Sequence, residues 1–312
     1  MRIALVTPAR PGSRAGNRHT ALRWAAMLRA AGHQVTIATE WESTGRDDLM
    51  IALHARRSHA SIRKFSEAHP DRPLVLALTG TDVYRDIRTD RDAQESLELA
   101  TRLVVLQPKA IEELPRRLQT KAHIVYQSCS TRLKHQPVKR KFRLCVIGHL
   151  RDEKDPLRAL HALEHLSGDL ELIQVGDSLD DQLAEEARRA MRLDKRYRWL
   201  GSVSHARALK LLASSHAMVI SSRMEGGANV VSEAIRIGVP VIASKISGNI
   251  GLLGAKYSAY YPLGDEKALA TLIERARSDW RFYSDLKRQL AKLRPMVSPA
   301  NEARLIRAAV RG

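Results

Sequence analysis

Two carboxylates flank a glycine-containing turn in the second half of the chain. Glu225 precedes the stretch Gly226, Gly227, Ala228, Asn229 and Val230, and seven residues separate it from Glu233. The pattern predicts a strand over 217–221 and a helix that begins near residue 229, so free backbone N–H groups and small residues meet at the turn. The carboxylates can accept hydrogen bonds from hydroxyl groups. These residues together indicate a site for a diphosphate whose neighbouring groups carry hydroxyls.

A second loop, residues 148–156, carries two cations between an expected strand over 143–147 and an expected helix over 156–166. Arg151 and Lys154 could neutralise a diphosphate, because fixed cations stabilise the charge that such a leaving group gains as its bond breaks. The same charges could instead face solvent in a helix-initiating turn. The matching pattern at Glu225 and Glu233 favours the catalytic interpretation.

Polar side chains also follow three expected strands in the first half of the chain. Parallel strands end at one edge of a sheet, where doubly wound domains bind ligands. His54 could alternatively be a strand-end histidine whose hydrogen bonds are satisfied within the protein. Gly16, after the first strand, is a candidate for binding the donor, because glycines allow a phosphate to approach closely. The other candidates are Gly12, Arg14 and Asn17 after the first strand, His54, Arg56 and Arg57 after another, and Thr81 and Asp82 after the strand over 73–78.

Asp90, Arg91 and Asp92 fit the D-x-D pattern with which metal-dependent enzymes hold a divalent ion on a diphosphate. They lie at the start of an expected helix over 92–100, where aspartates favour the positive end of the helix dipole. Arg151 and Lys154 already supply positive charge. We therefore expect helix capping here and predict no metal.

Strands alternate with helices along most of the chain, which predicts an α/β fold of two doubly wound units. The polar, basic stretch 128–141 has no periodicity and is typical of a linker. We expect an N-terminal domain over 1–135, a C-terminal domain over 136–290 and a helical segment over 291–312 that packs back on the first domain. Helices are also expected over 109–117 and over 282–310, the latter broken near Pro295 and Pro299. Two such domains would place a ligand cleft at the strand ends of both.

The composition excludes some functions and leaves others open. A net charge of +18 would suit nucleic acid or an anionic surface, yet aromatic residues are only 4 %, so stacking platforms for single strands are scarce. No apolar run reaches the about 20 residues that a membrane span requires. The two cysteines lack metal-ligand spacing, which favours a reducing cytoplasm. We expect no nucleic acid and no membrane among the partners.

A signature of GT-B glycosyltransferases, E-x7-E, is similar to the string from Glu225 to Glu233. The resemblance continues after Glu233 with Ala234 and with Gly238-Val239-Pro240-Val241. The resemblance implies that Glu225 contacts the donor sugar or reacting centre, that Glu233 binds the ribose, and that the backbone from Gly227 to Val230 holds the diphosphate. Arg151 and Lys154 match the cations of the family's G-x-L-x3-K loop. Residues 80–82 are similar to its H-G-T-D loop, but Leu78 and Thr79 stand where many relatives place a histidine.

Longer strings resemble the selenosugar synthases of selenoneine biosynthesis, namely residues 7–25, 51–65, 76–87, 146–159, 197–204 and 221–234. That resemblance implies a metal-independent transfer from UDP-N-acetylglucosamine or UDP-glucose to selenophosphate, with the UDP-sugar as substrate and no cofactor. It also implies other enzymes of that pathway as possible partners. The acceptor would meet Gly12, Arg14, Asn17, His54, Arg56, Arg57 and Thr81, with Asp82 as the candidate general base. A transferase with a sugar, lipid or thiol acceptor remains the alternative, as does a basic binding protein on the same scaffold.

Overall fold

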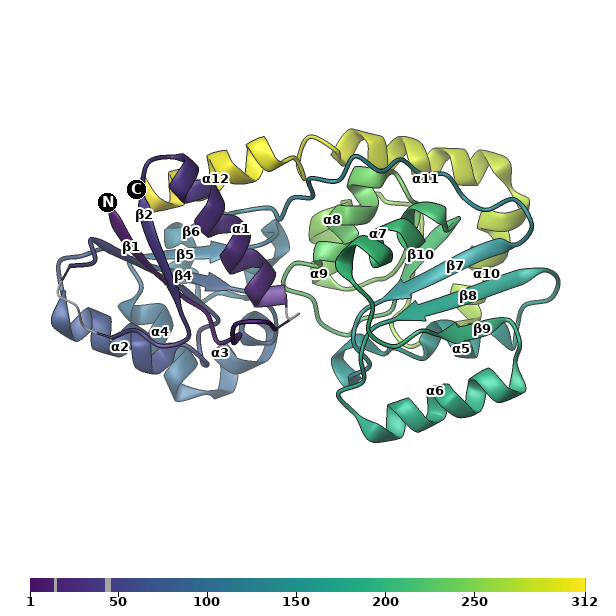
Figure 1. Ribbon diagram of the computed structural model, residues 1–312, viewed down its shortest axis with the longest axis horizontal. Coiled ribbons are helices and arrows are strands. Elements are labelled where there is room, and N and C mark those ends of the chain that lie inside the picture. The colour runs from purple at the N-terminus through teal and green to yellow at the C-terminus, as the bar shows by residue number, and fades with distance from the viewer. Residues whose placement is uncertain (14–15, 43–45, 312) are drawn as a thin grey trace. The chain divides into compact units, whose positions relative to one another are not determined.

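The computed structural model describes residues 1–13, 16–42 and 46–311, and these form two compact units. Unit 1 consists of Met1–Ser128 with Ser298–Gly312, and unit 2 consists of Cys129–Val297. Each contains one parallel sheet of six strands with helices around it (Figure 1). The doubly wound α/β prediction is confirmed for both.

The sheet of unit 1 has the strand order β2-β1-β3-β4-β5-β6. Its central strands β3 and β4 read LMIAL and LVLAL and are buried along their whole length, as expected where helices cover both faces of a parallel sheet. The strands are β1 (Arg2–Val6), β2 (Gln34–Ala38), β3 (Leu49–Leu53), β4 (Leu74–Leu78), β5 (Arg102–Val105) and β6 (Ala122–Ile124). The order changes direction between β1 and β3, so loops after these two strands flank a switch point.

Alternate residues of these strands enter two separate cores. Trp24 and Leu28 of helix α1 (Gly16–Ala30) pack on one face, together with Ile306 and Val310 of α12 (Pro299–Arg311). The opposite face is covered by α2 (His59–Ala68), α4 (Arg91–Leu99) and two 3-10 helices, η2 (Pro108–Glu113) and η3 (Arg116–Lys121). Both faces of the sheet are therefore buried.

Helix α12 belongs to unit 1 although the whole of unit 2 precedes it in the sequence (Figure 1). Glu302 of α12 is fully buried and accepts hydrogen bonds from Arg23 Nε at 2.7 Å, Trp24 Nε1 at 2.8 Å and the Ser128 backbone N–H at 2.8 Å. One buried carboxylate thus joins α12 to α1 and to the end of the first segment of unit 1.

The sheet of unit 2 has the strand order β12-β11-β10-β7-β8-β9. The first strand of unit 2, β7, lies between β8 and β10, which is the arrangement that creates a switch point at the carboxyl ends of β7 and β10. The strands are β7 (Phe142–Ile147), β8 (Leu170–Val175), β9 (Tyr197–Trp199), β10 (Ala217–Ile220), β11 (Val241–Ser244) and β12 (Tyr260–Tyr261).

Seven helices accompany this sheet in the described residues of unit 2. Helix α7 packs against α8 and β7, whereas α10 packs against α5 and β11. The helices are α5 (Arg158–Leu163), α6 (Asp181–Leu193), α7 (His205–Ser214), α8 (Asn229–Ile237), α9 (Ser247–Leu253), α10 (Glu266–Ser278) and α11 (Trp280–Leu293). The expected interruption near Pro295 and Pro299 separates α11 from α12 and is confirmed.

The prediction of a single helix over 109–117 is wrong. Two short 3-10 helices, η2 and η3, replace it, with Leu114 extended at φ −77° and ψ 148° between them. Pro115 causes the break, because its ring disfavours helical backbone at the preceding residue and it has no N–H to donate. The helix expected over 156–166 is also too long, since α5 covers only Arg158–Leu163.

A π-helical turn, η1 (Asp82–Asp86), follows β4 and leads into the short helix α3 (Ile87–Thr89), in a stretch for which no helix was predicted. The short elements α9 and β12 were likewise not predicted.

Candidate active site

A crevice at the switch point of unit 2 brings the two chemical motifs of the sequence together. It is lined by Val146, Ile147, Gly148, His149, Lys154 and Pro156 from β7 and its following loop, and by Val219, Ile220, Ser221, Ser222, Glu225 and Val230 from β10 and its following loop. The loop after β7 supplies a cation and the loop after β10 supplies a carboxylate. The predicted convergence of these motifs is therefore a feature of the folded unit.

Lys154 and Glu225 form an ion pair in this crevice. The Lys154 ammonium donates to Glu225 Oε1, and the Ser222 hydroxyl donates to the same oxygen at 2.6 Å. Glu225 is 6 % exposed, so its charge depends on these two donors. The Lys154 side chain is 23 % exposed, which leaves the ammonium within reach of a bound solute.

The turn that carries Lys154 is held by the loop after β10. The Ser221 hydroxyl is bonded to the carbonyl oxygens of Lys154 at 3.0 Å and Asp155 at 2.8 Å. The Arg223 backbone N–H donates to the Glu153 carbonyl at 2.9 Å. Asp155 adopts a left-handed backbone at φ 42°, which ends the 3-10 turn η4 (Asp152–Lys154). These bonds fix the position of the cation relative to the carboxylate loop.

Helix α8 begins at the edge of the crevice as expected. Its N-cap, Ala228, has no side-chain acceptor for the amides of the first turn. The preceding Gly226 is buried and Gly227 half-buried. The helix thus presents backbone N–H groups at the turn where the sequence placed a diphosphate.

The backbone of Glu225 also lies against Gly248 of α9. A Cβ atom added at Gly248 would lie 2.0 Å from the Glu225 carbonyl oxygen and 2.8 Å from Glu225 Cβ. Only glycine allows this approach, so α9 packs directly against the backbone of the Glu225 loop.

Arg151 lies at the N-cap of η4 with an extended backbone. Its side chain is 42 % exposed, and its nearest carboxylate is Glu153 at 3.9 Å, which is longer than a hydrogen bond. Its Nε atom is buried and has no hydrogen-bond partner among the described residues. The guanidinium therefore retains donors for an anion.

Glu233 lies one turn into α8 and is paired with His205, the first residue of α7. The distance from His205 Nε2 to Glu233 Oε1 is 2.7 Å, and the two side chains are 57 % and 14 % exposed. His205 was not among the residues predicted from the sequence, because two polar residues on separate helices carry no local signal of their contact.

In unit 1, Asp82 is fully buried and organises the loop after β4. Its carboxylate accepts the backbone N–H groups of Gly80 at 2.7 Å, Thr79 at 3.0 Å and Ala55 at 3.2 Å. Ala55 belongs to the loop after β3, so Asp82 ties the two loops together. These three hydrogen bonds indicate that Asp82 positions the loops, whereas Asp82 was expected from the sequence to be the general base.

His54 is buried at 3 % exposure and has a left-handed backbone at φ 77°. The Arg57 backbone N–H donates to Nδ1 at 3.4 Å, which assigns the ring proton to Nε2, and Nε2 lies 3.4 Å from the Thr81 hydroxyl. Burial lowers the pKa of His54, against the raising effect of nearby Asp82. The structure favours the alternative of a histidine satisfied within the protein.

The remaining predicted residues of unit 1 lie at or near the surface. Arg56 and Arg57 are exposed, with Arg56 Nε bonded to Asp86 at 3.1 Å, and Thr81 is half-buried. Gly12 is exposed at φ 80°, Gly16 begins α1, and Asn17 is half-buried. Arg14 lies outside the described residues. Loops after β1, β3 and β4 thus carry these side chains at the switch-point edge of the sheet.

Asp90 caps helix α4, because its side chain accepts the Ala93 backbone N–H at 2.9 Å. The capping prediction is confirmed. Across residues 1–13, 16–42 and 46–311, no group of three or more His, Cys, Asp or Glu side chains is arranged to hold a metal ion.

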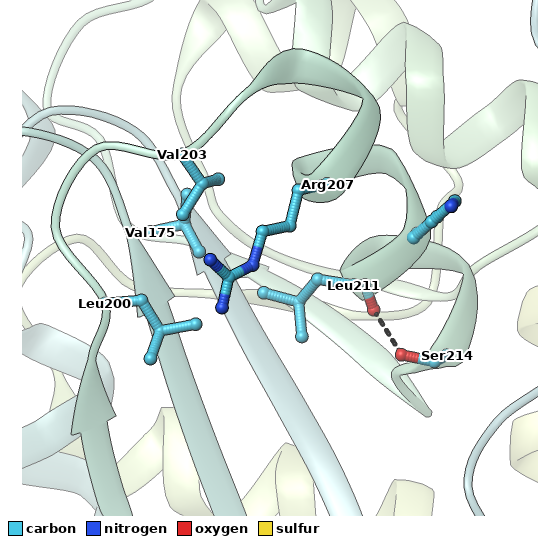
Figure 2. A pocket seen from close by; sticks show the side chains of 7 residues that line it. Val175, Leu200, Val203, Arg207, Leu211 and Ser214 are labelled. Carbon is cyan, nitrogen blue, oxygen red and sulfur yellow. Dashed lines mark hydrogen bonds between the residues drawn. The ribbon is translucent and has the colours of Figure 1, made fainter.

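A separate hollow of about 390 Å³ lies beside α7 (Figure 2). Figure 2 shows the Arg207 side chain extending over an apolar wall that includes Leu200 and Leu211. The hollow shares no lining residue with the crevice of Lys154 and Glu225 and contains none of the predicted site residues. Within the described part of the chain, no helix is both long and apolar enough to cross a membrane.

Comparison with known proteins gives a family and a set of structural neighbours. Across their full lengths, the chain is similar to Anabaena HepE solved with UDP, at TM-score 0.81 and 17 % identity over 100 % of each chain. It is also similar to a sucrose-phosphate synthase from Thermosynechococcus elongatus, at TM-score 0.77 and 15 % identity over 99 % of this chain and 98 % of that one. The lipopolysaccharide outer core galactosyltransferase WaaB gives TM-score 0.70 and 13 % identity over 100 % and 99 %.

At these identities the neighbours establish the fold alone, which is the GT-B architecture of two Rossmann-like units. A comparison with curated protein sequences gives no match. The model of the family described as glycosyl transferases group 1 matches residues 130–292, which is more than half of the 312 residues. The chain belongs to the group 1 glycosyl transferases.

Proposed function

We propose that this protein transfers the sugar of a UDP-sugar to selenophosphate, forming a C–Se bond and releasing UDP. The binding of a UDP-sugar donor is supported by one observation: Lys154 and Glu225 form an ion pair in one crevice at the switch point of unit 2. Doubly wound sheets bind nucleotides at this place.

The groups around the crevice suit each part of a nucleotide-sugar. Arg151 and Lys154 supply cations for the diphosphate, and the amides of α8 from Gly227 to Val230 supply donors. Glu225 faces the donor sugar, and Glu233 takes the ribose hydroxyls. The Anabaena neighbour was solved with UDP and with UDP-glucose, which supports a uridine donor.

Catalysis in this proposal consists mainly of stabilising the leaving group. The C–O bond to the β-phosphate breaks with its electron pair moving to UDP, so negative charge grows beside Arg151 and Lys154. Lys154 is already oriented by Glu225 and by the turn that Ser221 holds. Little reorganisation is then required when the donor binds.

The acceptor half rests on the resemblance of residues 7–25, 51–65, 76–87 and 221–234 to selenosugar synthases. Selenophosphate is small and multiply charged, so it requires cations and amides. Exposed Arg56 and Arg57, with Thr81, Gly12 and Asn17 on the neighbouring loops, supply such groups. We assign His54 and Asp82 to holding these loops in place.

The reaction balances without a metal or a redox cofactor. The selenium lone pair attacks the anomeric carbon while UDP leaves, which gives a sugar joined through selenium to phosphate. Water then hydrolyses the P–Se bond and releases phosphate and the selenosugar. An anionic selenium nucleophile has no proton to lose, so a strong general base is unnecessary. The two buried cysteines, Cys129 and Cys145, fit a reducing compartment such as the cytoplasm.

Mass spectrometry tests this proposal. The purified protein is incubated with UDP-N-acetylglucosamine or UDP-glucose, with and without fresh selenophosphate, in the presence of EDTA. We expect UDP release together with a sugar mass that carries the isotope pattern of selenium. UDP release with sugar, lipid or thiol acceptors but not with selenophosphate would overturn the selenium assignment. The absence of UDP binding would overturn the donor assignment.

A further inference from the structure

We infer that His205 is a positioning residue for Glu233, holding one carboxylate oxygen so that the other is presented to the two hydroxyls of a ribose. The inference rests on the proposed function, because it names how the nucleotide site of unit 2 recognises its sugar. His205 would act through Glu233 and not by touching the reacting atoms.

The contact is short and directional. His205 Nε2 lies 2.7 Å from Glu233 Oε1, within the range of a charge-assisted hydrogen bond. Among the hydrogen bonds between described residues, this is the only one that reaches the Glu233 carboxylate. Oε2 therefore remains available as an acceptor.

The elements on both sides of the contact are fixed. The Ser204 side chain caps α7 by accepting the Arg207 backbone N–H at 3.3 Å, which sets the place of His205 as the first helical residue. Helix α7 packs against α8, which carries Glu233. The imidazole is 57 % exposed and the Glu233 side chain is 14 % exposed, so the contact lies where solvent reaches the histidine.

A glutamate side chain has three rotatable torsions, and ordering them on binding costs free energy. His205 would remove part of this cost before the nucleotide arrives. A preoriented carboxylate oxygen can accept from the hydroxyls of a cis-diol, and a site built for hydroxyls rejects a ligand that lacks them. His205 would then sharpen the preference for ribose over a sugar without the diol.

Calorimetric binding of UDP and 2′,3′-dideoxy-UDP tests the inference. The proteins compared are the unmodified chain, His205→Ala, His205→Gln, Glu233→Ala and the control His161→Ala. His161 is a matched control because it also forms an exposed histidine–glutamate pair, with Glu186 at 3.3 Å, but between α5 and α6. Thermal melting of each variant checks that it is folded.

We expect the unmodified protein to bind UDP at least about tenfold more tightly than the dideoxy analogue. His205→Ala should weaken the binding of UDP about fivefold, because only the hydroxyl contacts are lost. The affinity for the dideoxy analogue should stay within about twofold of that of the unmodified protein. His205→Gln should retain most of the preference, since its amide can also donate. His161→Ala should change neither affinity.

Three results would overturn the inference. Equal weakening of both ligands in His205→Ala would mean that the residue supports the fold or another part of the nucleotide. An unchanged preference in His205→Ala, with the preference lost in Glu233→Ala, would leave the ribose contact in place and remove the role of His205. Failure of the unmodified protein to bind UDP would overturn the donor assignment itself, and the inference with it.

Discussion

The Lys154 ammonium and the Glu225 carboxylate are hydrogen-bonded across the switch point of unit 2, one from the loop after β7 and the other from the loop after β10. Each compensates the charge of the other at a place where Glu225 is almost fully buried. A donor diphosphate that binds beside Lys154 would share its ammonium with Glu225. The pair therefore connects the stability of this crevice with its chemistry.

Replacing Lys154 with alanine should lower both turnover and stability. The loss of a fixed cation should reduce the rate of UDP release under saturating donor by more than about tenfold. Glu225 would also be left with only the Ser222 hydroxyl, which should lower the free energy of unfolding by about 1–3 kcal/mol. Steady-state kinetics and urea denaturation measure the two effects.

The control for Lys154→Ala is Lys141→Ala, which breaks an exposed ion pair with Asp169 at 3.4 Å. That change should alter stability by less than about 1 kcal/mol. Adding Glu225→Gln to Lys154→Ala should recover much of the lost stability but none of the lost turnover. Turnover of Lys154→Ala close to that of the unmodified protein would place the diphosphate elsewhere.

Gly248→Ala should distort the crevice of Lys154 and Glu225 without altering any charged group. The new methyl group would lie 2.0 Å from the Glu225 carbonyl oxygen, so the backbone of that loop must move. We expect a fall of about 1–3 kcal/mol in the free energy of unfolding, as for overpacked cores. The rate of sugar transfer should fall at least about tenfold, because displaced catalytic groups lose their alignment.

Ser247→Ala at the neighbouring position serves as the comparison for Gly248→Ala, since it adds no atoms. It should retain most of the activity. Similar activity in both variants would show that the position of the Glu225 loop does not limit the rate.

Glu302→Ala should destabilise unit 1. The change removes the common acceptor of Arg23, Trp24 and the Ser128 backbone N–H, and Trp24 and Ser128 are buried. We expect a loss of about 3–5 kcal/mol, the range for breaking a buried charge pair. Hydrogen exchange followed by mass spectrometry should show faster exchange in α1, β1 and α12 than in unit 2.

Glu98→Ala, which breaks the exposed pair between Glu98 and Arg117, should leave exchange in unit 1 nearly unchanged. The exchange rate of unit 1 in Glu302→Gln should lie between the rates in Glu302→Ala and Glu98→Ala, because the amide oxygen still accepts hydrogen bonds. Unaltered exchange in Glu302→Ala would contradict the buried role of this carboxylate.

The stability of unit 2 should fall as the pH is lowered below about 6.5, through His135. Burial lowers the pKa of His135 to about 4, although its Nε2 is bonded to the Ser215 carbonyl at 2.9 Å. Above pH 6.5 the folded and unfolded chains both hold this residue neutral, so it has no effect there. Between about 6.5 and about 4 only the unfolded chain binds the proton, which costs stability, and below about 4 the effect levels off.

The expected contribution of His135 is on the order of 1–3 kcal/mol after allowance for its partial exposure. Urea denaturation at pH 7.5, 5.5 and 4.5 measures it, by comparison of the unmodified protein with His135→Gln. The variant should lose less stability over this range. His161→Gln, at an exposed position, should show the same loss of stability with pH as the unmodified protein. A pH dependence of His135→Gln identical to that of the unmodified protein would contradict the prediction.

The sequence sufficed to predict two doubly wound units and the two loops that supply Lys154 and Glu225, because strands and helices alternate clearly and both turns follow strands. It did not indicate which strands are neighbours. That β7 lies beside β10 depends on pairing between segments far apart in the chain, and only this pairing joins Lys154 to Glu225.

Other features escaped prediction for reasons that are local. Pro115 divides a stretch whose apolar spacing looks helical, and Asp82 draws the backbone of residues 79–80 toward its carboxylate before the π-helical turn. His205 and Glu233 are ordinary polar residues on separate helices, and their contact follows from the packing of α7 on α8. The roles of buried loop residues such as Ser221 likewise require the fold to be known.

The return of α12 to unit 1 has a consequence for how the chain folds as it is made. Unit 2 is one uninterrupted segment, Cys129–Val297, and can close as soon as its last helix leaves the ribosome. Unit 1 begins first but is completed last, because Glu302 arrives only after all of unit 2 has been synthesised. Until then the α1 face of its sheet, including Trp24 and Leu28, lacks part of its cover. During synthesis the earlier unit is therefore the one whose apolar surface stays exposed for longer.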